Sequence, residues 1–193
     1  MDNSTDTYKI VRFRLNNESY ALNVYKVYEV IIPPKITEIP NMPDYVPGVI
    51  NLRGEVIPVI DLKHKMGLKK TELDLDTRII VVEFSDQKEN KRSVGVLADQ
   101  VSDVLTVKKS ELHTPPDMGT RIRQELLHGL LKVDDDKFLM YLNLDKLMTA
   151  DEIIHAVEKA DAMDEESEDN GQEKNKDQDN SKSKEAASES ASS

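Results

Sequence analysis

The chain has 193 residues, with 26 Lys and Arg against 37 Asp and Glu, and its formal net charge is −11. Residues 161–193 hold 11 of the acids and 4 of the bases, so the first 160 residues carry a net charge of only −4. This balance argues against nucleic-acid binding through a broad basic face, and the absence of Cys excludes disulfides, thiolate metal sites and a thiol nucleophile.

Both ends of the chain are polar. Residues 1–7 are short and polar, and residues 164–193 contain no Val, Ile, Leu, Phe, Tyr or Met. Such segments bury too little apolar surface to offset their chain entropy, so we expect disorder in 1–7 and 161–193 and one domain over 8–160. No apolar run approaches the ~20 residues of a membrane span, and the start lacks the pattern of a secretion signal. We therefore expect a cytoplasmic protein without membrane insertion.

The first part of the domain has the alternation of short strands. Residues 8–15 place apolar side chains on one face at every second position, and a polar break at 16–18 separates them from a second alternating set, Tyr20, Leu22 and Val24. Residues 31–48 contain five prolines and predict an extended connection. Residues 49–62 predict two strands joined at Arg53 and Gly54.

Later segments repeat this organisation. Residues 78–84 and 93–98 flank a charged loop as a hairpin, and residues 128–133 and 137–144 flank Asp134–Asp136 in the same way. One longer helix is expected from about 150 to 161, because Thr149 and Glu152 form a capping box before an apolar stripe.

Two internal matches predict a duplication. Residues 20–31 match 94–105 at an offset of 74, and residues 55–66 match 137–148 at an offset of 82. Both copies of the second match are preceded by a strand that begins with Gly and two apolar residues, at Gly48 and at Gly129. We therefore predict a mainly β fold of two small five-stranded β-barrel subdomains, with repeats near 20–66 and 94–148, that share a hydrophobic seam. A C-terminal helix and a disordered tail complete this prediction.

No pattern of residues indicates catalysis or a cofactor. The four His residues are too far apart in the chain for a local zinc motif, and no phosphate loop or nucleophile elbow occurs. Asp134–Asp136 lacks the ligand spacing of a calcium loop and predicts a solvated turn. We expect no enzyme activity, no metal and no cofactor.

Arg53 is the most informative polar residue, because it interrupts an otherwise apolar stretch beside Gly54. One interpretation is a solvated Arg at a hairpin turn. The other is a planar five-donor group presented to carboxylates or carbonyls of a partner. The residues alone leave both open.

Several motifs in order resemble the CheW coupling proteins of bacterial chemotaxis. The central one is V-P-G-V-I-N-L-R-G-E-V-I-P-V-I-D-L over 46–62, and the others are V-Y-K-V-Y-E-V (24–30), V-G-V-L-A-D-Q-V-S-D-V-L (94–105), L-H-G-L-L (127–131) and L-N-L-D-K-L (142–147). The resemblance runs from about Tyr8 to Val157. The 85–92 loop looks longer than the family's usual turn, and the acidic tail lies outside the family pattern.

The resemblance implies an adaptor rather than an enzyme. Its expected partners are the regulatory domain of a CheA-type histidine kinase, the cytoplasmic hairpin tip of chemoreceptors, and other CheW-like domains in the same array. The positions that match the family's partner-contact residues are Val27, Glu29, Gly48, Arg53 and Gly54, together with Val101 at the repeat position of Val27. Packing or turn geometry remains an alternative role for Val27 and Gly48.

The alternative function, from a different class, is a small β-barrel module that binds a ligand or an oligonucleotide. Barrels that bind oligonucleotides combine basic residues with aromatic side chains for base stacking. Here the aromatic content is 5%, Trp is absent and the domain is acidic. The sequence favours the adaptor.

Overall fold

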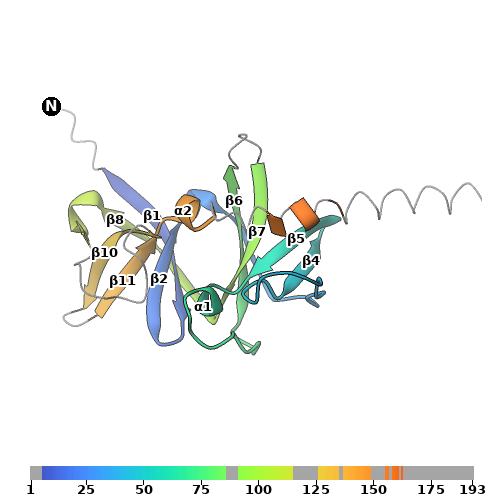
Figure 1. Ribbon diagram of the computed structural model, residues 1–193. Helices are drawn as coiled ribbons and strands as arrows, with labels where there is room; N and C mark the ends of the chain where they lie inside the picture. The colour runs from blue at the N-terminus through green and yellow to red at the C-terminus, as the bar shows by residue number, and fades with distance from the viewer. Residues whose placement is uncertain are drawn as a thin grey trace, which may run out of the picture.

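The computed structural model describes residues 6–85, 91–114, 126–134 and 137–148, and, of the C-terminal segment, 155–156, 158–160 and 162. The described strands form two sheets that lie side by side (Figure 1). In spatial order, the first sheet contains β8 (Gln100–Lys108), β1 (Thr7–Leu15), β2 (Glu18–Asn23), β11 (Lys137–Leu142), β10 (Leu127–Asp134) and β9 (Leu112–His113). The second contains β3 (Val27–Ile31), β6 (Arg78–Ser85), β7 (Lys91–Ala98), β5 (Glu55–Ile60) and β4 (Gly48–Leu52).

Short helical elements connect the strands. Two 3₁₀ turns, η1 (Val24–Lys26) and η2 (Lys109–Glu111), follow β2 and β8. Two short α-helices, α1 (Leu62–Lys65) and α2 (Leu144–Met148), follow β5 and β11. The described residues near the C-terminus, 155–156, 158–160 and 162, are helical, and Ala156 and Ala160 are buried.

The strand order follows the internal repeat. The order β3-β6-β7-β5-β4 of one sheet is matched, strand for strand, by β8-β1-β2-β11-β10 of the other. Neighbours are antiparallel except at one equivalent position in each sheet, where β5 runs parallel to β7 and β11 runs parallel to β2. Each sheet therefore contains strands from both halves of the chain, and the two halves are intertwined.

The two β-subdomains are confirmed, but their hydrogen-bonded ladders are open rather than closed barrels. One ladder has six described strands instead of five, because β9 adds a two-residue strand beside β10. In the second sheet, β3 and β4 are the two edges of the ladder. A side-chain ion pair, Arg53 to Glu29, joins the end of the β4–β5 hairpin to β3 instead of backbone hydrogen bonds.

Three apolar clusters form the core. One lies within each sheet, with Ile50, Val59 and Ile79 in the second and Ile10, Leu131 and Tyr141 in the first. The largest cluster is the predicted seam, and its buried members come from β1, β2, β5, β6, β7, β11 and both α-helices. Burial at this seam joins the two sheets into one folded unit, since apolar area removed from water is the main favourable contribution to folding.

Several local predictions are corrected. Thr7 belongs to β1 rather than to the N-terminal tail, and it pairs with Lys108. Val24 lies in η1 instead of continuing β2, because the Asn23 side chain accepts a hydrogen bond from Tyr25 N and ends the strand.

Leu144 lies in α2 instead of ending a strand, because Asn143 Oδ1 accepts from Lys146 N and begins a helix. Ala162 is helical, although the predicted disordered tail begins at 161. The predicted capping box, the hairpin tips at 86–90 and 135–136, and the rest of that tail (161 and 163–193) lie outside the described residues.

Candidate partner-binding site

The edge strand β3 carries exposed apolar side chains. Val27, Glu29 and Ile31 alternate on one side of the strand and are half-buried, whereas Tyr28 and Val30 on the other side are exposed. Tyr25 before the strand and Ile32 after it are also highly exposed. Monomeric proteins rarely gather exposed apolar side chains at one place, so this strand is a candidate interface.

Arg53 lies at the tip of the β4–β5 hairpin. Its φ is 58°, and that of Gly54 is 98°, so both loop residues are left-handed, as a two-residue hairpin with the strand twist requires. Asn51 Oδ1 accepts a hydrogen bond from Gly54 N at 3.1 Å and stabilises the turn. A Cβ at Gly54 would meet nothing within 4 Å, so the surface around the turn is open.

The structure brings Arg53 and Glu29 together. Arg53 Nη2 donates to Glu29 Oε2 at 3.1 Å, and the Arg53 side chain is 69% exposed while that of Glu29 is 22% exposed. The other carboxylate oxygen, Oε1, is buried and has no hydrogen-bond partner among the described residues. The pair leaves most of the guanidinium exposed, and its N–H groups suit carboxylates or carbonyl oxygens of another protein.

Gly48 has a structural reason for its identity. It is buried at the start of β4 with φ of 147°, and a Cβ there would lie 2.0 Å from the carbonyl oxygen of Thr37. The segment at Thr37 crosses β4 at this point and exchanges two backbone hydrogen bonds with Val49, of 2.8 and 2.9 Å. Gly48 thus permits a close approach of two backbones.

Val27 and Val101 occupy equivalent positions at the edges of the two sheets. Val27 pairs with Val82 on β6, and Val101 pairs with Phe13 on β1. Both are half-buried and pack against the seam cluster. Val101 therefore lies on the edge of the other sheet, on β8, and belongs to a different surface from Arg53.

The sequence reasoning selected Glu29 and Arg53, which the structure places in contact, but missed Tyr28, Val30 and Ile32. The available signal was an apolar run on both sides of a short strand just before a proline-rich segment. A strand with two apolar sides is either buried on both or has an exposed apolar side.

A metal site or a membrane span would require particular features in the described part of the chain. Among the described residues, no group of three or more His, Asp or Glu side chains could hold a metal ion. No helix in the described part of the chain is long and apolar enough to cross a membrane. A cavity of about 660 Å³ lies beside α1, and none of the six predicted contact residues lines it.

Comparison with known proteins agrees with this architecture. A family model described as the CheW-like domain matches residues 9–152. The chain is 33% identical over 141 residues to the chemotaxis protein CheW of Klebsiella aerogenes, covering 73% of this chain and 81% of that protein. It is 38% identical over 109 residues to the chemotaxis protein CheW of Bacillus subtilis, covering 56% of this chain and 67% of that protein.

A solved structure is also similar. The scaffolding protein TtCheW from Thermoanaerobacter tengcongensis has 34% sequence identity and a TM-score of 0.66, with 79% of this chain and 94% of that chain covered. The family model spans most of the described domain. The chain belongs to the CheW-like domain family.

Proposed function

We propose that this protein is a chemotaxis adaptor that couples chemoreceptors to a CheA-type histidine kinase. The family match over 9–152 and the similar scaffolding protein support a coupling role rather than catalysis. The alternative of an oligonucleotide-binding module is not favoured. The finer parts of the proposal are the partner segments, namely the receptor's cytoplasmic hairpin tip and the kinase's regulatory domain, and the residues that contact them.

The observation that carries the site is the Arg53–Glu29 pair on one side of β3, together with the exposed apolar side chains on the other side of the same strand. Arg53 sits on a rigid two-residue turn, and the partly buried Glu29 carboxylate holds it in place at 3.1 Å. Interfaces often combine a charged anchor of this kind with apolar side chains that exclude water around it. Tyr28 and Val30 are exposed apolar side chains on the same strand as Glu29, and the exposed Ile32 directly follows that strand.

Arg53 substitutions test the charged part of the site. Arg53→Ala should leave the fold within about 1 kcal/mol, because an exposed ion pair contributes little to stability. It should weaken binding to a receptor fragment or to the kinase regulatory domain by about thirtyfold, the cost of losing a charged anchor. Arg53→Lys should restore only part of this affinity, because an ammonium cannot reproduce the planar donor group.

Arg12→Ala is the matched control. Arg12 Nε donates to Asp103 Oδ1 at 2.7 Å, so this variant removes another partly exposed ion pair, on the edge of the other sheet. Affinity would be measured by calorimetry and stability by thermal unfolding on all variants. Loss of stability without loss of affinity in Arg53→Ala would assign Arg53 to the fold. Equal losses of affinity in both variants would show a general charge effect.

The apolar part has its own test. Tyr28→Ser combined with Ile32→Ser removes two exposed apolar side chains and should leave the fold intact. It should weaken binding to one of the two partners more than tenfold, because buried apolar area is lost from the interface. Val104→Ser on β8 is the control for that partner and should leave its affinity unchanged, since Val104 is similarly exposed but lies on the equivalent strand of the other sheet. Unchanged affinity for both partners would remove β3 from the interface.

A further inference from the structure

The intertwined topology raises a problem of specificity. Because the halves are repeats, a second arrangement is available in which each half folds on itself. In that arrangement β3 would take the place of β8 beside β1, and β5 would take the place of β11 beside β2. The alternation of apolar side chains fits both arrangements, so strand pattern alone does not select the observed one.

Two ion pairs connect the halves at the points where the arrangements differ. Lys26 Nζ in η1, between β2 and β3, lies 2.9 Å from Asp145 Oδ1 in α2. Lys63 Nζ in α1 lies 3.0 and 3.2 Å from the two oxygens of Asp99, between β7 and β8. Each pair therefore joins the strand junction of one half to the helix of the other half.

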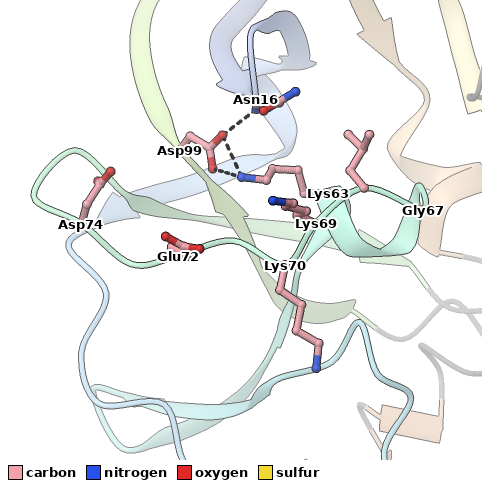
Figure 2. Close-up of a pocket in the computed structure, with 9 residues that line it drawn as sticks. Asn16, Lys63, Gly67, Lys69, Lys70, Glu72, Asp74 and Asp99 are labelled. Carbon is pink, nitrogen blue, oxygen red and sulfur yellow. Dashed lines mark hydrogen bonds and ion pairs between the residues drawn. The ribbon is translucent and has the colours of Figure 1, made fainter.

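The second pair is part of a larger contact. Asp99 Oδ2 also accepts from Asn16 N in the β1–β2 turn at 2.5 Å (Figure 2). The side chains of Lys63 and Asp99 are only 12% and 25% exposed, and both line the cavity beside α1. Lys26 and Asp145 are more exposed, at 37% and 59%. The Lys63–Asp99 pair is therefore the less screened of the two.

The two pairs are equivalent in position and opposite in polarity. The helices begin in the same way, because Asp61 Oδ1 accepts from His64 N and Asn143 Oδ1 accepts from Lys146 N. The offset of 82 superimposes Lys63 on Asp145. The offset of 74 places Asp99 one position from the equivalent of Lys26, at the same junction.

We propose that this reversal of polarity selects the intertwined fold against the self-contained one. In the self-contained arrangement the junction of each half would meet its own helix, which places Lys26 against Lys63 and Asp99 against Asp145. Both contacts are repulsive there, whereas both are attractive in the observed fold. Two pairs of the same polarity would be attractive in either arrangement and could not discriminate between them.

Charge reversal of one pair tests this inference. Lys26→Asp with Asp145→Lys keeps an ion pair at each observed position but makes both contacts of the other arrangement attractive. Lys63→Asp with Asp99→Lys has the same effect. Reversing both pairs together restores the opposite polarity of the two pairs, and thus the discrimination between the two arrangements. The variant with all four substitutions is therefore the matched control.

A disulfide trap reports on the arrangement, because the chain has no Cys of its own. Val30 lies opposite Ile80 in the observed fold, and its repeat equivalent Val104 lies opposite Val11. Cysteines at positions 11 and 30 should therefore meet only in the self-contained arrangement, at the Cα separation that a disulfide allows. The variants Val11→Cys and Val30→Cys would be added to the full chain, which is refolded from denaturant in an oxidising thiol buffer.

The expected result is a crosslinked fraction about tenfold higher after reversal of one pair than in the unreversed chain, since the two contacts of the self-contained arrangement each change from repulsive to attractive, by about threefold each. Reversal of both pairs should return it to the unreversed level, and about 1 M salt should reduce the difference. An unchanged crosslinked fraction after single reversal would overturn the proposal. The proposal would also be overturned if the variant with all four substitutions showed the sum of the two single-pair effects on the crosslinked fraction. Effects of local damage at each pair add, whereas effects on pairing specificity cancel.

Discussion

Gly48 offers a direct test of how the edge of the second sheet is held together. In Gly48→Ala the new Cβ would lie 2.0 Å from the Thr37 carbonyl oxygen and 2.7 Å from its carbon, both backbone atoms that cannot turn away. The residue would also keep a φ of 147°, where a side chain costs about 1–3 kcal/mol. Relief of the contact would separate Thr37 from Val49 and lose two backbone hydrogen bonds of about 1 kcal/mol each.

These contributions add to a loss of about 3–5 kcal/mol in the free energy of unfolding. For a domain of this size the midpoint of thermal unfolding should fall by about 10 °C or more. Gly54→Ala is the control, because Gly54 also has a positive φ but a Cβ there meets nothing within 4 Å. It should cost only the backbone strain, about 1 kcal/mol.

Thermal and urea unfolding of both variants would measure these losses. Similar small losses in the two variants would refute the steric argument, because only Gly48 has a backbone atom in contact. A normally stable Gly48→Ala protein that fails to bind a partner would instead make Gly48 a contact residue. We expect its effect on binding to follow its effect on folding.

Three further predictions concern stability. Asp61→Ala should lower the free energy of unfolding by about 2–4 kcal/mol, measured by urea unfolding. Buried Asp61 accepts hydrogen bonds from His64 N, Thr71 N and Thr71 Oγ1, and its loss leaves these donors unpaired. A loss under about 1 kcal/mol would contradict this role. Burial, with the nearby Glu18 charge, raises the pKa of Tyr20 to about 12 from 10.0. Between these values the unfolded chain releases a proton that the folded chain keeps, so stability should fall as the pH rises above about 10, by about 2–3 kcal/mol at most. Tyr20→Phe should show a shallower alkaline loss, and an identical pH profile would contradict the assignment. Truncation after Met163 should leave the midpoint of thermal unfolding unchanged within about 2 °C, because residues 164–193 contain no large apolar side chain to bury; a larger fall would show that the tail contributes to the fold.

The hairpins and the seam were predictable from sequence for one physical reason. Alternation at period two assigns side chains to the two faces of a strand, and a turn signal such as Arg53-Gly54 fixes which strands are antiparallel neighbours. β4–β5, β6–β7 and β10–β11 are therefore found where the pattern placed them. The duplication was visible because equivalent strands must bury the same alternating positions.

The exchange of strands between halves could not be predicted in this way. β3 and β8 would bury the same positions beside either β1 or β6, so the pattern leaves the partner undetermined. The helices α1 and α2 have four and five residues, too few for a helical period to be distinguished from the end of a strand. Their start depends on single capping contacts at Asp61 and Asn143.

The candidate site was predictable in its residues but not in its geometry. Glu29 lies on β3, and Arg53, 24 positions later, lies at the tip of the β4–β5 hairpin. β3 and β4 are the opposite edges of one ladder. Only the curvature of the sheet brings the two edges within ion-pair distance. Curvature depends on twist and on bulges, such as the register shift between Val27 and Glu29, which a period-two pattern does not encode.

Duplication gives an adaptor two equivalent edges, and divergence makes them different. On β3 the exposed side chains include Tyr28 and Val30, and on β8 their repeat equivalents are Ser102 and Val104. Glu29 pairs with Arg53 across the edges of its sheet, whereas its equivalent Asp103 pairs with Arg12 on the neighbouring strand.

The two edges thus differ in both apolar area and the placement of charge, although the backbone around them has the same order of strands. Discrimination between partners depends on the difference between two binding free energies, so unlike edges suit a protein that binds two unlike partners at once. A single edge repeated twice would bind the same partner at both ends. We therefore expect substitutions on β3 and on β8 to affect the binding of different partners.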